Sequence, residues 1–147
     1  MTMKFTILGC GSSMGVPRPA LGWGECDPNN PKNRRRRTSL LVERQGEKGT
    51  TRVLIDTSPD LREQLIDADV SWVDGVFITH EHADHCHGID DLRALFVHKR
   101  RRVDVYTSEH TAKTLRARFG LTSDLGFRMP SIWFADGHRT VAPVYLY

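Results

Sequence analysis

The sequence predicts an α/β protein, a β-sheet layered with helices, from three observations. Alternating apolar segments typical of strands are interleaved with longer segments whose apolar residues recur at helical spacing. A glycine-containing segment typical of a β-hairpin turn lies between two of the strands. The 147 residues, 39% hydrophobic and 27% charged, suit a globular domain large enough for a real core. We therefore expect one α/β domain over residues 1–147.

The N-terminal region predicts one strand followed by a long loop. Residues 3–9 alternate like a strand and continue into a glycine-rich segment over 9–15. A dinucleotide-binding turn would require a helix at this point, and Pro17 and Pro19 exclude one. The glycine-rich segment is instead expected to form an exposed loop whose backbone can approach an anion. Residues 16–37, rich in Pro, Gly, Asn and Arg, predict a long surface loop.

The remaining elements follow from caps, breakers and periodicity. In chain order we expect strands over 38–43 and 51–56 with a hairpin turn over 45–49, a helix from a Ser58 cap to about Ala68, a strand over 75–79, a helix over 88–97, a strand over 103–107 and a helix from a Ser108 cap to about Gly120. The tail from Arg139 to Tyr147 alternates like a strand. Because it ends on apolar residues with nothing after them, we expect the chain to be cut short relative to its fold.

The segment from His80 to His85 carries the strongest functional signal. It reads His-Glu-His-Ala-Asp-His and follows an apolar strand. Imidazole and carboxylate ligands suit zinc, manganese or iron. In an extended chain alternate residues point to one side, so His80 and His82 can share one ion, while Asp84 and His85 are offset and suit a second. Isolated histidines are usually surface or core residues, but this spacing favours a metal site.

Charge and composition limit the partners and the cellular location that we expect for this protein. The net charge is +3, and the runs 34–37 and 99–102 each hold four consecutive cations. The first run offers attraction for a phosphorylated substrate, although a solvated loop with no specific role is the favoured interpretation of both runs. The sequence contains neither a membrane-length apolar run nor a signal peptide pattern. We expect a cytoplasmic protein without membrane partners.

The histidine motif, together with its flanking segments, resembles the metallo-β-lactamase superfamily of αββα sandwich hydrolases. Other segments narrow the resemblance to the branch that contains the phosphoribosyl 1,2-cyclic phosphate phosphodiesterases. The motifs that narrow it are Ile7 to Ser13, Gly15-Val16-Pro17, Asn33 to Arg37, and His87 to Arg93, whereas Leu54 to Thr57 belongs to the superfamily resemblance. The resemblance extends over essentially the whole chain, which corresponds to the N-terminal half of such a protein.

The resemblance implies specific roles. His80 and His82 would bind a first divalent ion, and Asp84 and His85 a second, with Zn or Mn the expected metals. Asp84 is in addition the candidate catalytic residue. Asp56 would orient a ligating histidine, although a cap on the following turn is an equal alternative. Family members complete the site with ligands from a C-terminal half.

The expected function is a metal-dependent phosphodiesterase acting on small, cyclic phosphodiesters through a metal-activated hydroxide. A thioester or lactone hydrolase and an RNA-processing nuclease are alternatives from the same superfamily, the nucleic acid partner being less favoured. A further alternative is an inactive, truncated metal-binding fragment. A homodimer that lends ligands across an interface would restore a complete site.

Overall fold

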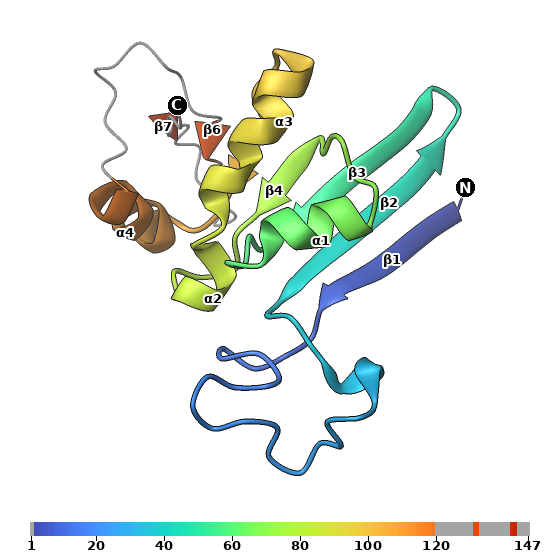
Figure 1. The fold of residues 1–147 in the computed structure, drawn as a ribbon. Helices are drawn as coiled ribbons and strands as arrows, with labels where there is room; N and C mark the ends of the chain where they lie inside the picture. The colour runs from blue at the N-terminus through green and yellow to red at the C-terminus, as the bar shows by residue number, and fades with distance from the viewer. Residues whose placement is uncertain (1, 120–130, 133–141, 144–147) are drawn as a thin grey trace.

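The five-stranded sheet of the computed structural model carries helices on one face (Figure 1). The structure describes residues 2–119, 131–132 and 142–143. The strands are β1 (Thr2–Gly9), β2 (Ser39–Gly46), β3 (Gly49–Ile55), β4 (Gly75–Phe77) and β5 (Val105–Tyr106), in that spatial order. β1, β2 and β3 pair antiparallel, whereas β3, β4 and β5 pair parallel. The expected α/β class is confirmed.

All five strands predicted over residues 3–107 are present, with changed boundaries. β2 runs to Gly46 because the hairpin turn is tighter than predicted, with Gly46 paired to Gly49. Gly49 has a φ of 125°, a conformation that glycine adopts without strain. Two short strands, β6 (Ser131–Ile132) and β7 (Ala142–Pro143), pair antiparallel. Apart from 142–143, the strand predicted over 139–147 lies outside the described residues.

The helices are shorter or shifted relative to prediction. They are α1 (Leu61–Asp67), α2 (Ala83–Cys86), α3 (Leu92–Lys99) and α4 (Glu109–Phe119), with 3₁₀ turns at Pro31–Asn33 and Ile89–Asp91. The predicted Ser58 cap is wrong. Ser58 is buried, and its hydroxyl accepts from the Asp60 N–H and donates to Gln64, so residues 58–60 form a turn that precedes α1. The Ser108 cap is confirmed by the Thr111 N–H donating to its hydroxyl at 3.3 Å.

One face of the sheet forms the core. Leu41, Leu54, Val76 and Val105 are aligned across neighbouring strands and are nearly inaccessible to solvent. They pack against apolar residues of the helices, with Leu61, Leu65, Ile89, Leu92 and Leu95 in the same buried cluster. Burial of this kind is the main stabilising contribution to such a fold.

The opposite face of the sheet remains apolar and exposed within the described part of the chain. Phe5 is 62% exposed, Ile7 70% and Phe77 46%. Exposed apolar surface of this kind commonly marks an interface. None of the helices in the described ranges is long and apolar enough to cross a membrane.

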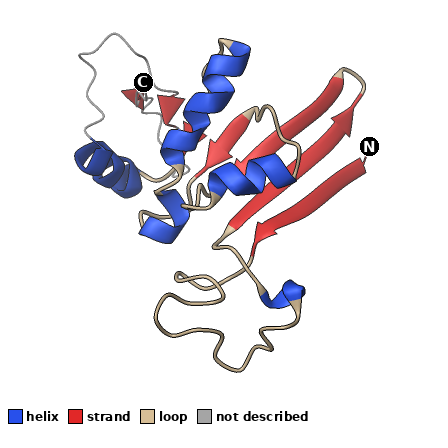
Figure 2. Cartoon of the chain, viewed as in Figure 1, coloured by secondary structure: helices blue, strands red, loops and turns tan. Residues whose placement is uncertain are grey.

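The three parallel strands end at one edge of the sheet, beside the long loop over residues 10–38 (Figure 2). Asp56 follows β3, Ile78 and Thr79 follow β4, and Thr107 follows β5. The Thr107 hydroxyl donates to the Ile78 carbonyl at 2.8 Å, which joins two of these strand ends. Ligand sites of open α/β sheets lie at this edge, and the histidine motif begins here.

Candidate metal centre

Asp56 is the buried carboxylate on which the site is built. It follows β3 with a φ of 63°, a left-handed conformation that is uncommon for residues other than glycine. Its N–H donates to the Phe77 carbonyl at 2.7 Å, which fixes the turn against the end of β4. The side chain is only 5% exposed. A strained, buried carboxylate at the end of a strand is typical of a functional position.

A motif histidine and the residue just before the motif bind this carboxylate. His85 Nδ1 lies 2.7 Å from Asp56 Oδ2. The Thr79 N–H donates to Oδ1 at 2.8 Å, and its hydroxyl lies 2.9 Å from Oδ2. The carboxylate therefore joins segments that are more than twenty residues apart in the sequence. The contact with a motif histidine fits the orienting role expected for Asp56.

These hydrogen bonds define which histidine nitrogens are free. Because a carboxylate only accepts, His85 Nδ1 must donate its proton to Asp56, which leaves the Nε2 lone pair unused by this bond. The Thr79 hydroxyl gives its one hydrogen to Asp56, so it accepts from His80 Nδ1, 2.9 Å away. In both rings Nε2 is therefore available to bind a metal ion. Metal-bound histidines usually have this arrangement, in which the other ring nitrogen donates a hydrogen bond to a neighbouring group.

The three rings of the motif lie together. The centroids of His80 and His82 are 4.6 Å apart, and those of His80 and His85 are 3.9 Å apart. Two imidazoles on one tetrahedral ion hold their centres about 5 Å apart, given metal–nitrogen bonds of about 2.0 Å. The first pair is close to that separation. The rings of the second pair would have to move apart to share one ion.

Asp84 and His85 lie in α2 rather than in an extended chain. The short helix begins after His82, whose carbonyl accepts from the His85 N–H at 2.9 Å. Asp84 Oδ2 then lies 3.4 Å from His85 Nε2. No group of three or more His, Cys, Asp or Glu side chains within the described residues is arranged to hold a metal ion. The donor set suits zinc or manganese, but its side chains would have to rearrange to enclose one.

Glu81 and Thr79 are two contributors that the sequence did not single out. Glu81 points to α4, where Thr111 Oγ1 donates to Oε2 at 3.3 Å and His110 Nε2 lies 3.4 Å from Oε1. The Arg118 guanidinium donates to the Glu81 carbonyl at 2.6 Å. These contacts fix the motif loop on α4. The only sequence signal for either residue was its position directly beside a motif histidine.

Of the other histidines, those that the structure describes form no hydrogen bond with Asp56 or Thr79. His87 contacts Arg118 at 3.3 Å and stacks edge-on against Phe119. His98 is exposed near the end of α3. His138 lies outside the described residues.

Changing Asp56 to Asn is expected to lower zinc affinity by about 10- to 100-fold, since outer partners of ligating histidines have effects of that size. Asparagine tolerates the left-handed backbone, so the change removes charge while keeping the turn. Competition with a chromogenic chelator measures the affinity. Asp69→Asn is the matched control because Asp69 also has a positive φ, 51°, but is exposed. Equal affinities in the two variants would contradict the assignment.

Comparisons with known proteins show what the chain is similar to. Residues 51–135 match the family model of the β-lactamase superfamily domain. A diphosphatase of the PhnP family is similar in structure, with a TM-score of 0.73 and 33% identity over 91% of this chain and 51% of that one. Zn²⁺-bound PqqB from Methylobacterium extorquens has a TM-score of 0.63 and 19% identity, covering 97% of this chain and 49% of its own.

A curated relative in sequence is an octanoyltransferase of Porphyromonas gingivalis. It is 39% identical over 116 residues, which are 79% of this chain and 23% of that protein. The chain thus spans about half the length of the solved structures it resembles and about a quarter of this relative.

Proposed function

The chain belongs to the metallo-β-lactamase superfamily, and on that premise we propose that it supplies metal ligands to a metal-dependent hydrolase of small phosphate esters. One observation carries the proposal: Asp56 and Thr79 hold the Nδ1 atoms of His85 and His80, so that both histidines offer Nε2 beside His82. An ordinary surface histidine pair has no reason to be oriented through a buried carboxylate.

In this proposal each motif residue has one role. His80 and His82 hold one ion, and Asp84 and His85 hold a second. Asp84 is the proposed catalytic residue, a carboxylate at the reacting centre. When bound, Zn²⁺ or Mn²⁺ ions supply Lewis acidity, which generates hydroxide near neutral pH and offsets charge on phosphate oxygens.

The chain's own residues set the orientation of that centre. The Asp84 carboxylate lies beside the His85 ring, with Oδ2 3.4 Å from Nε2. On the opposite side of the same ring, Asp56 binds Nδ1 and fixes its orientation. Glu81 holds the loop between the two histidines of the first pair against α4. Rigid placement of ligands is what allows such a site to favour the transition state over the substrate.

A small phosphorylated substrate, including a cyclic phosphodiester, is the proposed substrate class. It is supported by the 33% identity to a protein described as a diphosphatase. The acyl chemistry named for the octanoyltransferase relative gives less support, because this chain spans only 23% of that protein. A homodimer that completes the ligand set belongs to the same proposal.

The test is turnover by purified protein supplied with Mn²⁺ or Zn²⁺. We expect metal-dependent hydrolysis of bis(p-nitrophenyl) phosphate and no comparable hydrolysis of an acyl thioester. Hydrolysis of the thioester alone would replace the proposal with the acyl hydrolase alternative. Turnover of neither substrate at saturating metal would count against an active hydrolase.

A further inference from the structure

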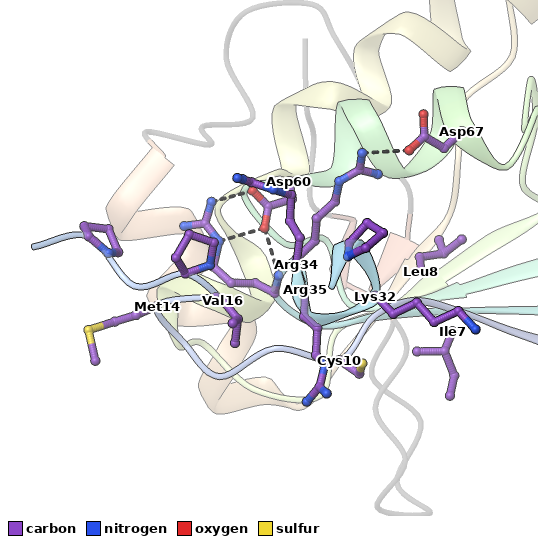
Figure 3. Close-up of a pocket in the computed structure, with 17 residues that line it drawn as sticks. Ile7, Leu8, Cys10, Met14, Val16, Lys32, Arg34, Arg35, Asp60 and Asp67 are labelled. Carbon is purple, nitrogen blue, oxygen red and sulfur yellow. Dashed lines mark hydrogen bonds and ion pairs between the residues drawn. The ribbon is translucent and has the colours of Figure 1, made fainter. Parts of the chain in front are cut away.

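A basic cleft lies between the long loop and α1 (Figure 3). Its volume is ≈ 760 Å³, within the range of small-molecule sites. Five cationic side chains, Lys32 and Arg34 to Arg37, line it together with two carboxylates, Asp60 and Asp67. Apolar side chains including Met14 and Val16 complete the walls. The arginine run therefore lines a cavity, and Arg34 and Arg35 in it remain exposed to solvent.

Both carboxylates are already engaged by the last two arginines of the run. Arg37 binds Asp60 through two nitrogens, at 2.6 and 2.9 Å, and Arg36 lies 2.7 Å from Asp67. The hydrogen bond from Arg37 holds the pKa of Asp60 below its ordinary value, so this carboxylate is charged at neutral pH. The other three cations of the lining face no lining carboxylate, which leaves the cleft with excess positive charge.

Arg35 and Arg34 are presented in defined positions. The backbone of Arg35 pairs with Val16 in both directions at 2.9 Å, whereas its guanidinium makes no hydrogen bond or ion pair within residues 2–119. The Arg34 guanidinium lies over the Trp23 ring at 5.5 Å, which supports its face and leaves its N–H edges for a ligand.

The glycine-rich segment explains how the cleft is built. The Gly11 N–H donates to the Arg36 carbonyl at 2.7 Å. A Cβ on Gly11 would lie 2.8 Å from the Arg35 carbonyl oxygen, and one on Gly9 would lie 1.8 Å from that of Arg37. Only glycine allows the two backbones to approach this closely. The packing fixes the arginine run in place.

The cleft adjoins the proposed metal centre. The Thr57 N–H, which lies between Asp56 and the cleft residue Asp60, donates to the His85 carbonyl at 2.8 Å and so joins this segment to the motif. Asp60 in turn lies at the start of α1, in the segment that continues from Asp56. A ligand in the cleft can therefore extend towards the histidines.

We propose that Arg34 and Arg35 bind a second anionic group of the substrate, a phosphate other than the one being hydrolysed. The reacting phosphate ester or anhydride then lies at the metal centre, and the apolar walls of the cleft contact the group between the two phosphates. The assignment to a substrate rests on the proposed function; the anion site itself does not.

Binding of inorganic pyrophosphate to metal-free protein in the presence of a chelator tests the anion site without any turnover. Isothermal titration calorimetry should show pyrophosphate binding that weakens by about tenfold in Arg35→Gln, the size expected for losing a charged hydrogen bond at a partly exposed site. Arg102→Gln is the matched control, since exposed Arg102 precedes β5 at the opposite edge of the sheet. Equal binding by both variants, or no binding by the unaltered protein, would overturn the proposal.

Turnover then separates this proposal from the proposed function. The substrates are the p-nitrophenyl ester of thymidine 5′-phosphate with and without a 3′-phosphate. We expect a kcat/KM preference for the form with two phosphates that falls about tenfold in Arg35→Gln and persists in Arg102→Gln. A preference that survives in Arg35→Gln overturns the substrate assignment. Pyrophosphate binding that depends on Arg35, with neither ester hydrolysed, supports the anion site and contradicts the proposed function.

Discussion

Replacing His82 with alanine is expected to reduce hydrolysis of bis(p-nitrophenyl) phosphate by about a thousandfold or more. Loss of a residue that only orients a metal-bound histidine already lowers metal affinity or activity by about 10- to 100-fold. His82 is proposed to contact the ion itself, so its loss should have a larger effect. Its ring stands 4.6 Å from that of His80, near the spacing of two imidazoles on one ion. The measurement is kcat/KM at saturating Mn²⁺, alongside the metal content of each protein.

His98→Ala provides the control for this prediction. His98 is exposed near the end of α3 and lies apart from the motif, so its loss should leave both metal content and turnover unchanged. An equal rate in His82→Ala and the unaltered protein would remove His82 from the centre. A loss of activity without loss of metal would assign His82 to the reaction rather than to ion binding.

Replacing Gly88 with alanine is expected to destabilise the fold by about 3 kcal/mol or more, the upper range for overpacking a tight site. A Cβ on Gly88 would lie 1.9 Å from the Ser58 carbonyl oxygen and 3.0 Å from Leu61 Cβ. The Gly88 N–H also donates to the Thr57 carbonyl, and the Thr57 N–H donates to that of His85. Separating these segments breaks the bonds that hold α2 beside Asp56, so metal affinity should fall together with stability.

Urea unfolding followed by circular dichroism measures this loss, and Gly46→Ala is the matched control. A Cβ on Gly46 would meet nothing closer than the Gly49 carbonyl oxygen at 3.5 Å, an ordinary contact. We expect its free energy of unfolding to change by less than about 1 kcal/mol. If Gly88→Ala is as stable as Gly46→Ala, the packing of α2 against the Asp56 turn is not what the structure indicates.

The strands and α4 could be predicted because their signals are local. Alternating apolar residues mark β1 and β2, the glycines Gly46 and Gly49 mark the hairpin, and Ser108 caps α4 through the Thr111 N–H. The Ser58 cap failed because the buried hydroxyl bonds to the Asp60 N–H and the Gln64 side chain within a turn, so the helix begins three residues later. Helix α2 was missed since four residues carry no periodicity.

The site could be predicted only in part, for a similar reason. The spacing of His80, His82 and His85 pointed to a metal, and the resemblance pointed to Asp56. Nothing local connects Thr79 to Asp56, which lies 23 residues earlier, so the hydrogen bonds that select Nε2 are visible only in the fold. The same holds for the glycine-rich segment, whose close packing against Arg35 to Arg37 places the arginines around a cleft.

Histidine side-chain ¹⁵N NMR during a zinc titration tests the central claim most directly, because it distinguishes the two ring nitrogens of each histidine. Without metal, His80 and His85 should carry their protons on Nδ1, as Thr79 and Asp56 require. On adding Zn²⁺, the Nε2 resonances of these two rings and a ring nitrogen of His82 should shift, whereas His98 and His110 stay unchanged. Zinc-bound Nδ1 in His85, or no change in any motif histidine at saturating zinc, would contradict the proposed metal centre.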